Sequence, residues 1–83
     1  MSLDHDAEEP LYLQLAAILR GQIGTGQISR RVPSVKTLTE QYDVAQGTAE
    51  RALAVLREEG LIRSRIGRGH FVVPVAERPG AQS

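Results

Sequence analysis

The sequence contains no cysteine and no tryptophan among its 83 residues, and only one phenylalanine. Without cysteine the chain forms no disulfide, thiolate metal site or cysteine nucleophile, so we expect an intracellular protein rather than a disulfide-rich secreted one. No stretch approaches the roughly 20 apolar residues of a membrane span, and the acidic N-terminus is unlike a signal peptide. We therefore expect one small cytoplasmic domain, of marginal stability and without membrane association.

Groups for catalysis or metal binding are also scarce. The only histidines are His5 and His70. The segment Asp4-His5-Asp6 has metal-ligating residue types, but nothing in the pattern fixes their geometry. Gly24-Thr25-Gly26 follows a predicted helix rather than a strand, so it does not indicate a phosphate-binding loop. We expect no enzymatic activity, no cofactor and no resident metal.

The chain lacks net charge, because ten Lys and Arg balance ten Asp and Glu. At first sight this argues against a nucleic-acid partner, but the charges are unevenly distributed. Residues 1–10 carry four acids and no Lys or Arg, whereas residues 20–36 carry four basic residues and residues 61–70 carry three, both without an acid. A local patch, rather than the total, sets the local field, so the two basic blocks fit nucleic acid. The alternative is a solvated surface of mixed charge.

The spacing of apolar residues predicts three helices. A first helix begins near Pro10 and is expected to end at Gly24 and Gly26. Ser34 is a good N-cap for a second, shorter helix, and residues 43–45 turn the chain into a third. The apolar stripes are, in chain order, Leu11, Leu15, Ile18, Leu19 and Ile23, then Val35, Leu38 and Tyr42, then Ala49, Ala52, Leu53 and Leu56.

A two-stranded hairpin is predicted after the third helix. Gly60 stands where a left-handed helix cap belongs, and residues 61–65 and 70–73 have the pattern of strands joined by residues 66–69. The expected fold is therefore an α/β, mainly α, winged helix-turn-helix: three helices followed by a two-stranded β-wing, over residues 10–74. Such a fold holds one helix in the DNA major groove while a loop reaches beside it. Residues 1–9 are expected to be a disordered acidic segment and residues 75–83 a tail or linker.

An ordered series of short motifs runs through this region. It consists of Pro10-Leu11-Tyr12, Gln14-Leu15, Ile23, Gly26, Pro33-Ser34, Leu38, Tyr42, Val44, Thr48, Arg51-Ala52-Leu53, Leu56, Glu59-Gly60-Leu61, Gly67-Arg68-Gly69 and Phe71-Val72. No single motif is diagnostic, but at these spacings the set resembles the N-terminal winged helix-turn-helix domain of the GntR family of bacterial transcription regulators.

The resemblance implies a sequence-specific regulator of transcription that binds double-stranded DNA as a repressor. It would work in the bacterial cytoplasm, on the nucleoid when bound. A single such module buries only about 600–1,000 Å² on DNA, so we expect a homodimer on a palindromic operator. Family members usually carry a larger C-terminal effector-binding domain, so this chain is either one domain of a longer protein or a stand-alone regulator; the effector stays unknown. The alternative is a winged-helix module that binds another protein, which the zero net charge and Glu50 favour.

The resemblance also implies three regions of DNA contact: the start of the second helix, the start of the third helix in the major groove, and the wing tip in or along the minor groove. The predicted DNA-binding residues are Ser34, Lys36, Ala45, Gln46, Gly47, Thr48, Arg51, Arg65, Gly67, Arg68, Gly69 and His70.

Several of these positions differ from the usual family residues, which leaves the operator sequence open. Gln46 is a candidate reader of adenine, because its amide can donate to N7 and accept from N6–H; the alternative is an ordinary solvent-facing residue. Glu50 is expected to orient a neighbouring arginine, the other possibility being acceptance from cytosine N4. Ala45 replaces the usual serine or threonine cap and weakens the start of the third helix by about 1 kcal/mol.

Two arginines have competing interpretations. Arg51 reaches phosphate or pairs with an acid, of which Glu50, Glu58 and Glu40 are candidates. Arg68 stands between two glycines that permit close approach, and a narrow groove attracts a guanidinium; the alternative is a plain hairpin turn with an exposed charge. Arg63 and Arg65 alternate along one strand and are expected to share a face.

Overall fold

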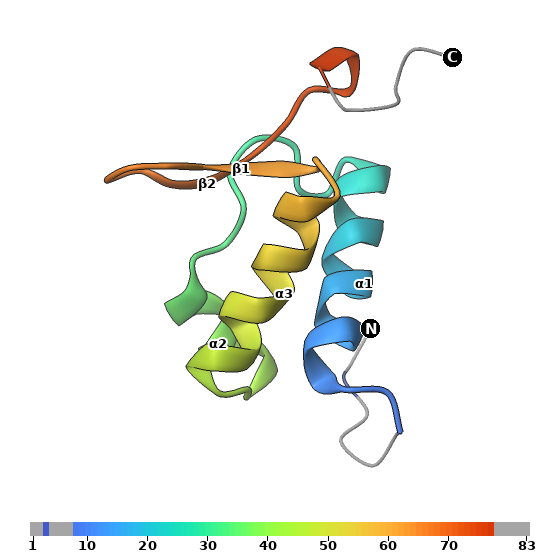
Figure 1. Ribbon diagram of the computed structural model, residues 1–83, viewed down its shortest axis with the longest axis vertical. Helices are drawn as coiled ribbons and strands as arrows, with labels where there is room; N and C mark the ends of the chain where they lie inside the picture. The colour runs from blue at the N-terminus through green and yellow to red at the C-terminus, as the bar shows by residue number, and fades with distance from the viewer. Residues whose placement is uncertain (1–2, 4–7, 78–83) are drawn as a thin grey trace.

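Three helices precede a two-stranded antiparallel hairpin, as the sequence predicts (Figure 1). The computed structural model describes residue 3 and residues 8–77. Most of the expected disordered segment 1–9, and residues 78–83, lie outside the described residues. The elements are α1 (Leu11–Thr25), α2 (Val35–Tyr42), α3 (Gln46–Glu58), β1 (Ile62–Arg65), β2 (Gly69–Val72) and a short 3-10 helix η1 (Val75–Glu77) within the expected tail.

Helix α1 runs through Gly24 and ends at Thr25, one residue before Gly26. The prediction that Gly24 and Gly26 both end it was wrong for Gly24, which lies inside the helix. A helical glycine costs only about 1 kcal/mol, and burial of the neighbouring Ile23 keeps this last turn in place. Gly26 is the true cap: its φ of 84° is left-handed, and its N–H donates to the carbonyl oxygen of Ile23.

Helix α3 lies at the centre of the fold and packs against α1, α2 and β1. Its small residues Ala49 and Ala52 are completely buried, which lets the neighbouring helices approach closely. The predicted stripes of α1 and α3 form the core except for Leu11, which is half-buried and packs against its edge. Its largest fully buried side chains are Leu15, Leu19, Leu38, Leu53, Leu56 and Ile62.

Helices α2 and α3 start differently. The Ser34 hydroxyl accepts a hydrogen bond from the backbone N–H of Thr37 at 3.1 Å, so α2 has the predicted N-cap. Ala45 has the extended backbone of a cap residue, with φ −67° and ψ 155°, but no side chain that can accept a hydrogen bond. The first amides of α3 therefore lack a side-chain partner from the cap residue.

We expect Ala45→Ser to stabilise the domain by about 1 kcal/mol, because the new hydroxyl can accept a hydrogen bond from a first-turn amide of α3. A domain of this size gains about 4–8 °C in Tm per kcal/mol. Urea unfolding followed by circular dichroism measures the change as a shift of the midpoint at constant slope. Ser34→Ala is the matched control and should destabilise by a similar amount. An unchanged midpoint in Ala45→Ser would contradict this account of the helix start.

The hairpin is held by a segment that the sequence pattern did not reveal. β1 pairs with β2 in antiparallel register, from Ile62 opposite Val72 to Arg65 opposite Gly69. On the other side of β2, the N–H of Val72 donates to the carbonyl oxygen of Arg30, and Arg31 forms an isolated bridge with Phe71. The two basic blocks of the sequence therefore lie side by side.

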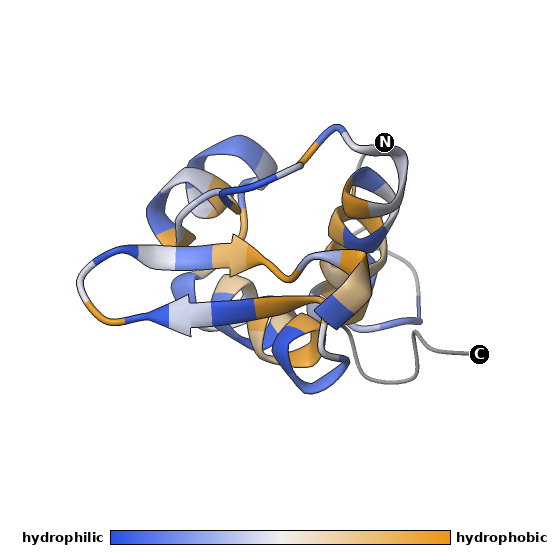
Figure 2. Cartoon of the chain, turned by 90° about the horizontal axis from the view of Figure 1, so that it is seen from above, coloured by the Kyte–Doolittle hydropathy of each residue, from blue (hydrophilic) through white to orange (hydrophobic). Residues whose placement is uncertain are grey.

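This pairing fixes the direction of the hairpin, which we call the wing (residues 62–72). It extends away from α1 on the side where α2 lies (Figure 1). Seen from above, the wing projects beyond the helices and has an apolar segment at its tip (Figure 2). Ile66 is fully exposed in the turn between the strands.

An ion pair joins α1 to Glu59, the residue that caps the end of α3. Arg20 of α1 donates from Nε and Nη2 to the carboxylate of Glu59, at 2.9 and 2.6 Å. These hydrogen bonds lower the pKa of Glu59 and raise that of Arg20. Both side chains are more than a third exposed, so solvent screening limits the stabilisation to below about 1 kcal/mol. Arg20 is thus occupied within the fold.

Candidate nucleic-acid interface

The predicted contact residues lie at the starts of α2 and α3 and on the wing, and all of them are exposed or half-buried. The structure brings the two helix starts together. A groove of about 370 Å³ is lined by Val35, Lys36 and Thr39 of α2 and by Gln46 of α3. Lys36 and Gln46, which are ten positions apart in the chain, therefore share one surface. Lys36 makes no ion pair with any described residue.

Arg51 is held by an aromatic ring rather than by an acid. Its guanidinium carbon lies 4.3 Å from the centroid of the Tyr12 ring on α1. None of the three candidate acids pairs with it among the described residues. A cation–π contact at an exposed site is worth about 0.5–1 kcal/mol and leaves the guanidinium N–H groups available at the ring's edge. No local sequence pattern indicated this pairing, since the two residues stand on different helices.

Gln46 and Glu50 form a hydrogen bond on the first turns of α3. The amide Nε2 of Gln46 donates to Oε1 of Glu50 at 3.2 Å. No arginine in the described part of the chain forms an ion pair with Glu50, so the expected arginine partner is not found there. Spacing of four residues along a helix brings side chains onto one face, so this contact was available to sequence reasoning and was missed.

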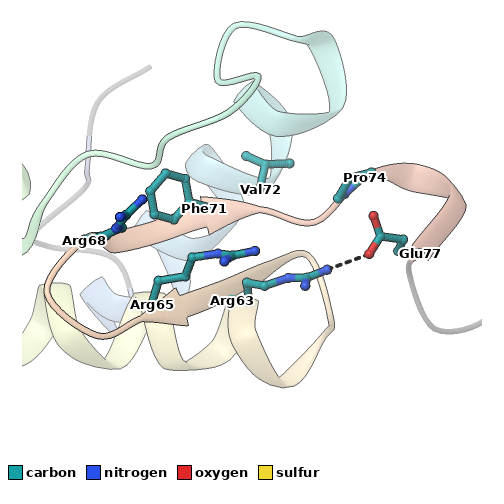
Figure 3. Close-up of a pocket in the computed structure, with 7 residues that line it drawn as sticks. All are labelled: Arg63, Arg65, Arg68, Phe71, Val72, Pro74 and Glu77. Atoms are coloured by element: carbon teal, nitrogen blue, oxygen red, sulfur yellow. Dashed lines mark hydrogen bonds and ion pairs between the residues drawn. The ribbon is translucent and has the colours of Figure 1, made fainter.

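The wing presents arginines on the face turned away from α3. Ser64 accepts a hydrogen bond from Arg57 of α3 at 3.3 Å, so the alternating Arg63 and Arg65 project from the opposite face of the strand, as predicted. A shallow hollow of about 400 Å³ on this face is shown in Figure 3. It is lined by Arg63, Arg65, Arg68, Phe71, Val72, Pro74 and Glu77.

The arginines of the hollow differ in how far they are neutralised. Arg63 pairs with Glu77 at 3.0 Å, while Arg65 and Arg68 pair with no acid in the described part of the chain. The turn itself is tight: the N–H of Arg68 donates to the carbonyl oxygen of Arg65 at 3.0 Å. Gly67 and Gly69 have φ of 75° and 94°, which L side chains rarely adopt. The two glycines thus hold Arg68 at an exposed tip.

His70 and Arg31 lie at the base of this tip. Burial lowers the pKa of His70, and the nearby positive charge of Arg57 lowers it further. The lowered pKa favours the neutral imidazole, and a neutral ring still donates one N–H. Nη2 of Arg31 lies 3.9 Å from where a Cβ on Gly69 would stand, so this arginine reaches the wing from the opposite edge of β2.

Residues 3 and 8–77 offer no grouping of three His, Cys, Asp or Glu side chains able to hold a metal ion. Nor does any helix among these residues have the length and apolar character needed to cross a membrane.

Comparison with known sequences gives one consistent result. The family described as bacterial regulatory proteins, gntR family, matches residues 11–72. The HTH-type transcriptional regulator YhdI of Bacillus subtilis is 35% identical over 75 residues, which is 88% of this chain and 16% of YhdI. The transcriptional repressor NagR of the same organism is 32% identical over 74 residues, 87% of this chain and 30% of NagR. The chain thus spans less than a third of either relative.

Solved structures agree with the fold. YtrA from Sulfolobus acidocaldarius, a GntR-family transcription factor, superimposes with a TM-score of 0.80 at 25% identity, covering 88% of this chain and 79% of YtrA. The DNA-binding domain of AraR, solved in complex with operator ORE1, gives a TM-score of 0.76 at 29% identity, covering 86% of this chain and 89% of that domain. The AraR structure is thus one of a domain with its operator bound.

Proposed function

The chain belongs to the gntR family of bacterial regulatory proteins, and we therefore propose that it binds double-stranded operator DNA and represses transcription. The observation that carries the proposal is the distribution of unpaired charge. Arg20 and Arg63 are tied to Glu59 and Glu77, whereas Lys36, Arg65 and Arg68 are free of ion pairs with the described residues. These three unpaired cations stand at the α2 start and on the wing.

The arrangement suits a helix in the major groove and a wing beside it. In this proposal the start of α3 contacts base edges, Lys36 and Arg51 contact phosphate, and Arg68 enters the adjacent minor groove. Residues 10–74 form the DNA-binding unit. The proposed contact residues are Ser34, Lys36, Ala45, Gln46, Gly47, Thr48, Arg51, Arg65, Gly67, Arg68, Gly69 and His70.

Two relatives support the finer parts of the proposal. The AraR domain was solved with its operator, which supports DNA as the partner here. NagR is a repressor, which supports repression as the regulatory outcome. Because one module of this size buries only about 600–1,000 Å² on DNA, we propose that two copies bind a palindromic site.

A gel-shift selection with the 83-residue chain tests the proposal. The protein is mixed with random-sequence duplexes at about 50 mM salt, and shifted duplexes are recovered, amplified and sequenced over several rounds. We expect enrichment of a palindromic site with half-sites about one helical turn apart. Absence of any shifted duplex would contradict the proposal and favour a surface for another protein. A shifted but unenriched pool would contradict sequence-specific binding.

A further inference from the structure

An acidic side chain stands on the surface proposed to meet DNA. Glu50 is exposed on the same face of α3 as Gln46, one helical turn further along. A carboxylate at this position repels phosphate. A residue of this kind on a DNA-binding surface is therefore expected to have another role that compensates for the repulsion. Gln46 is its hydrogen-bond partner, at 3.2 Å.

The chemistry of this bond determines which way the Gln46 amide turns. A glutamine amide has a donating and an accepting end of similar shape, and a free side chain can present either one. An ionised carboxylate only accepts hydrogen bonds. Glu50 therefore selects the rotamer in which the NH₂ group faces it, and the carbonyl oxygen of Gln46 is fixed on the other side.

The fixed amide keeps one complete edge for recognition. One N–H of Gln46 is used by Glu50, which leaves the second N–H and the carbonyl oxygen side by side. This donor–acceptor pair matches the N7 acceptor and N6–H donor of adenine in the major groove. With the opposite amide orientation, Glu50 would face an acceptor, and repulsion disfavours that state.

The neighbours of Gln46 leave this edge accessible. Ala45 and Gly47 flank it in the chain, and apart from the chain neighbours and the backbone of α3 itself, no atom lies within 4 Å of where a Cβ on Gly47 would stand. Gln46 is thus the long side chain between two small residues at the start of the helix, where close approach to base edges is possible. Lys36, which lines the same groove, offers only donors and does not duplicate the amide's acceptor.

We propose that Glu50 is a positioning residue that fixes the Gln46 amide for adenine, so that each operator half-site carries an A·T pair at the base Gln46 contacts. This inference rests on the proposed function, because it assumes that the start of α3 enters the major groove. Glu50 itself touches no base. Its contribution is to specificity, and its charge lowers affinity for all sequences alike.

The test measures a ratio of affinities. The selection described above supplies a site, and the position whose base preference Gln46→Ala removes is assigned to Gln46. Fluorescence anisotropy then gives the Kd of each variant for that site and for the same site with G·C in place of A·T. We expect wild type to favour A·T about tenfold. Glu50→Ala should reduce the ratio to about threefold or less while tightening binding to both duplexes.

Three further variants separate orientation from charge. Glu50→Gln accepts the bond in only one of its two amide orientations, so its ratio should lie between those of wild type and Glu50→Ala. In the Gln46→Ala background, Glu50→Ala should change the ratio no further. Glu58→Ala removes the same charge from the far end of α3 and should keep the wild-type ratio. Thermal unfolding of each variant confirms that it is folded.

Several outcomes would overturn the inference. A wild-type ratio in Glu50→Ala, an equal loss in the Gln46→Ala background, or an equal loss in Glu58→Ala would each remove the role assigned to Glu50. A selected site with no Gln46-dependent adenine would do the same. These results leave the proposed function standing, because DNA is still bound. If wild type binds no duplex, both this inference and the proposed function are overturned, and the selection experiment shows this before any variant is measured.

Discussion

Leu53→Ala is expected to cost about 2–5 kcal/mol of folding free energy. Leu53 is 1% exposed on α3, the helix that contacts α1, α2 and β1, so its removal leaves a cavity with packed neighbours on several sides. At about 0.05–0.15 kcal/mol per residue, an 83-residue domain has about 4–12 kcal/mol in total. The substitution therefore removes a large part of the stability and should lower the Tm by at least about 10 °C.

Thermal and urea unfolding measured by circular dichroism check this expectation. Val75→Ala is the control, because Val75 is 65% exposed and its truncation should change stability by less than about 0.5 kcal/mol. A Leu53→Ala variant within about 1 kcal/mol of wild type would mean that the centre of the fold collapses around the missing side chain. It would also contradict α3 as the element on which the other elements pack.

The helical part of the core was predictable because local periodicity determines it, whereas the buried Ile28 and Val32 lie on a connecting segment without such a pattern. Apolar residues three and four positions apart lie on one face of a helix and are buried together. Leu15, Leu19, Leu53 and Leu56 are indeed buried. The cap at Gly60 was equally local, and its φ of 78° is left-handed as predicted. Gly24 shows the limit of this reasoning, since a glycine near a helix end does not reveal whether tertiary packing carries the helix past it.

The contacts missed from the sequence join residues that are distant in the chain. Arg20 and Glu59 are 39 residues apart, and Tyr12 and Arg51 stand on different helices. The bridge from Arg31 to Phe71 joins β2 to a connecting segment. The paired part of that segment is too short to show the period-2 pattern of a strand. No local signal encodes such pairings, because they depend on how helices and strands pack.

These contacts also explain how a chain with zero net charge can present a positively charged surface to DNA, as the proposed function requires. Two of the acids, Glu59 and Glu77, are engaged by arginines that the proposal leaves off the DNA. Pairing of Arg30 and Arg31 with β2 brings the first basic block to the second. The sequence showed that each block was basic, but only the fold places them together.

Raising the salt concentration from 50 to 200 mM is expected to weaken DNA binding by about 150-fold per domain. Each cation that neutralises a phosphate adds about −0.9 to the slope of log K against log salt, and the proposal places four cations on the DNA: Lys36 and Arg51 at phosphate, and Arg65 and Arg68 on the wing. A slope of about −3.6 over a fourfold change in salt gives that factor. Anisotropy titrations with a selected duplex at five or six salt concentrations measure the slope directly.

Single substitutions then distinguish the effect of individual DNA contacts on the salt dependence from the effect of the domain's overall charge. Arg68→Ala should make the slope shallower by about 0.9 per domain, because one fewer counterion is released. Arg20→Ala removes the same charge from a residue that is tied to Glu59, and its slope should match wild type. Equal changes in the two variants would mean that the domain's total charge, rather than contacts at the wing, governs binding. A salt-independent affinity would remove phosphate contact from the proposal, since a protein that neutralises phosphates must release their counterions.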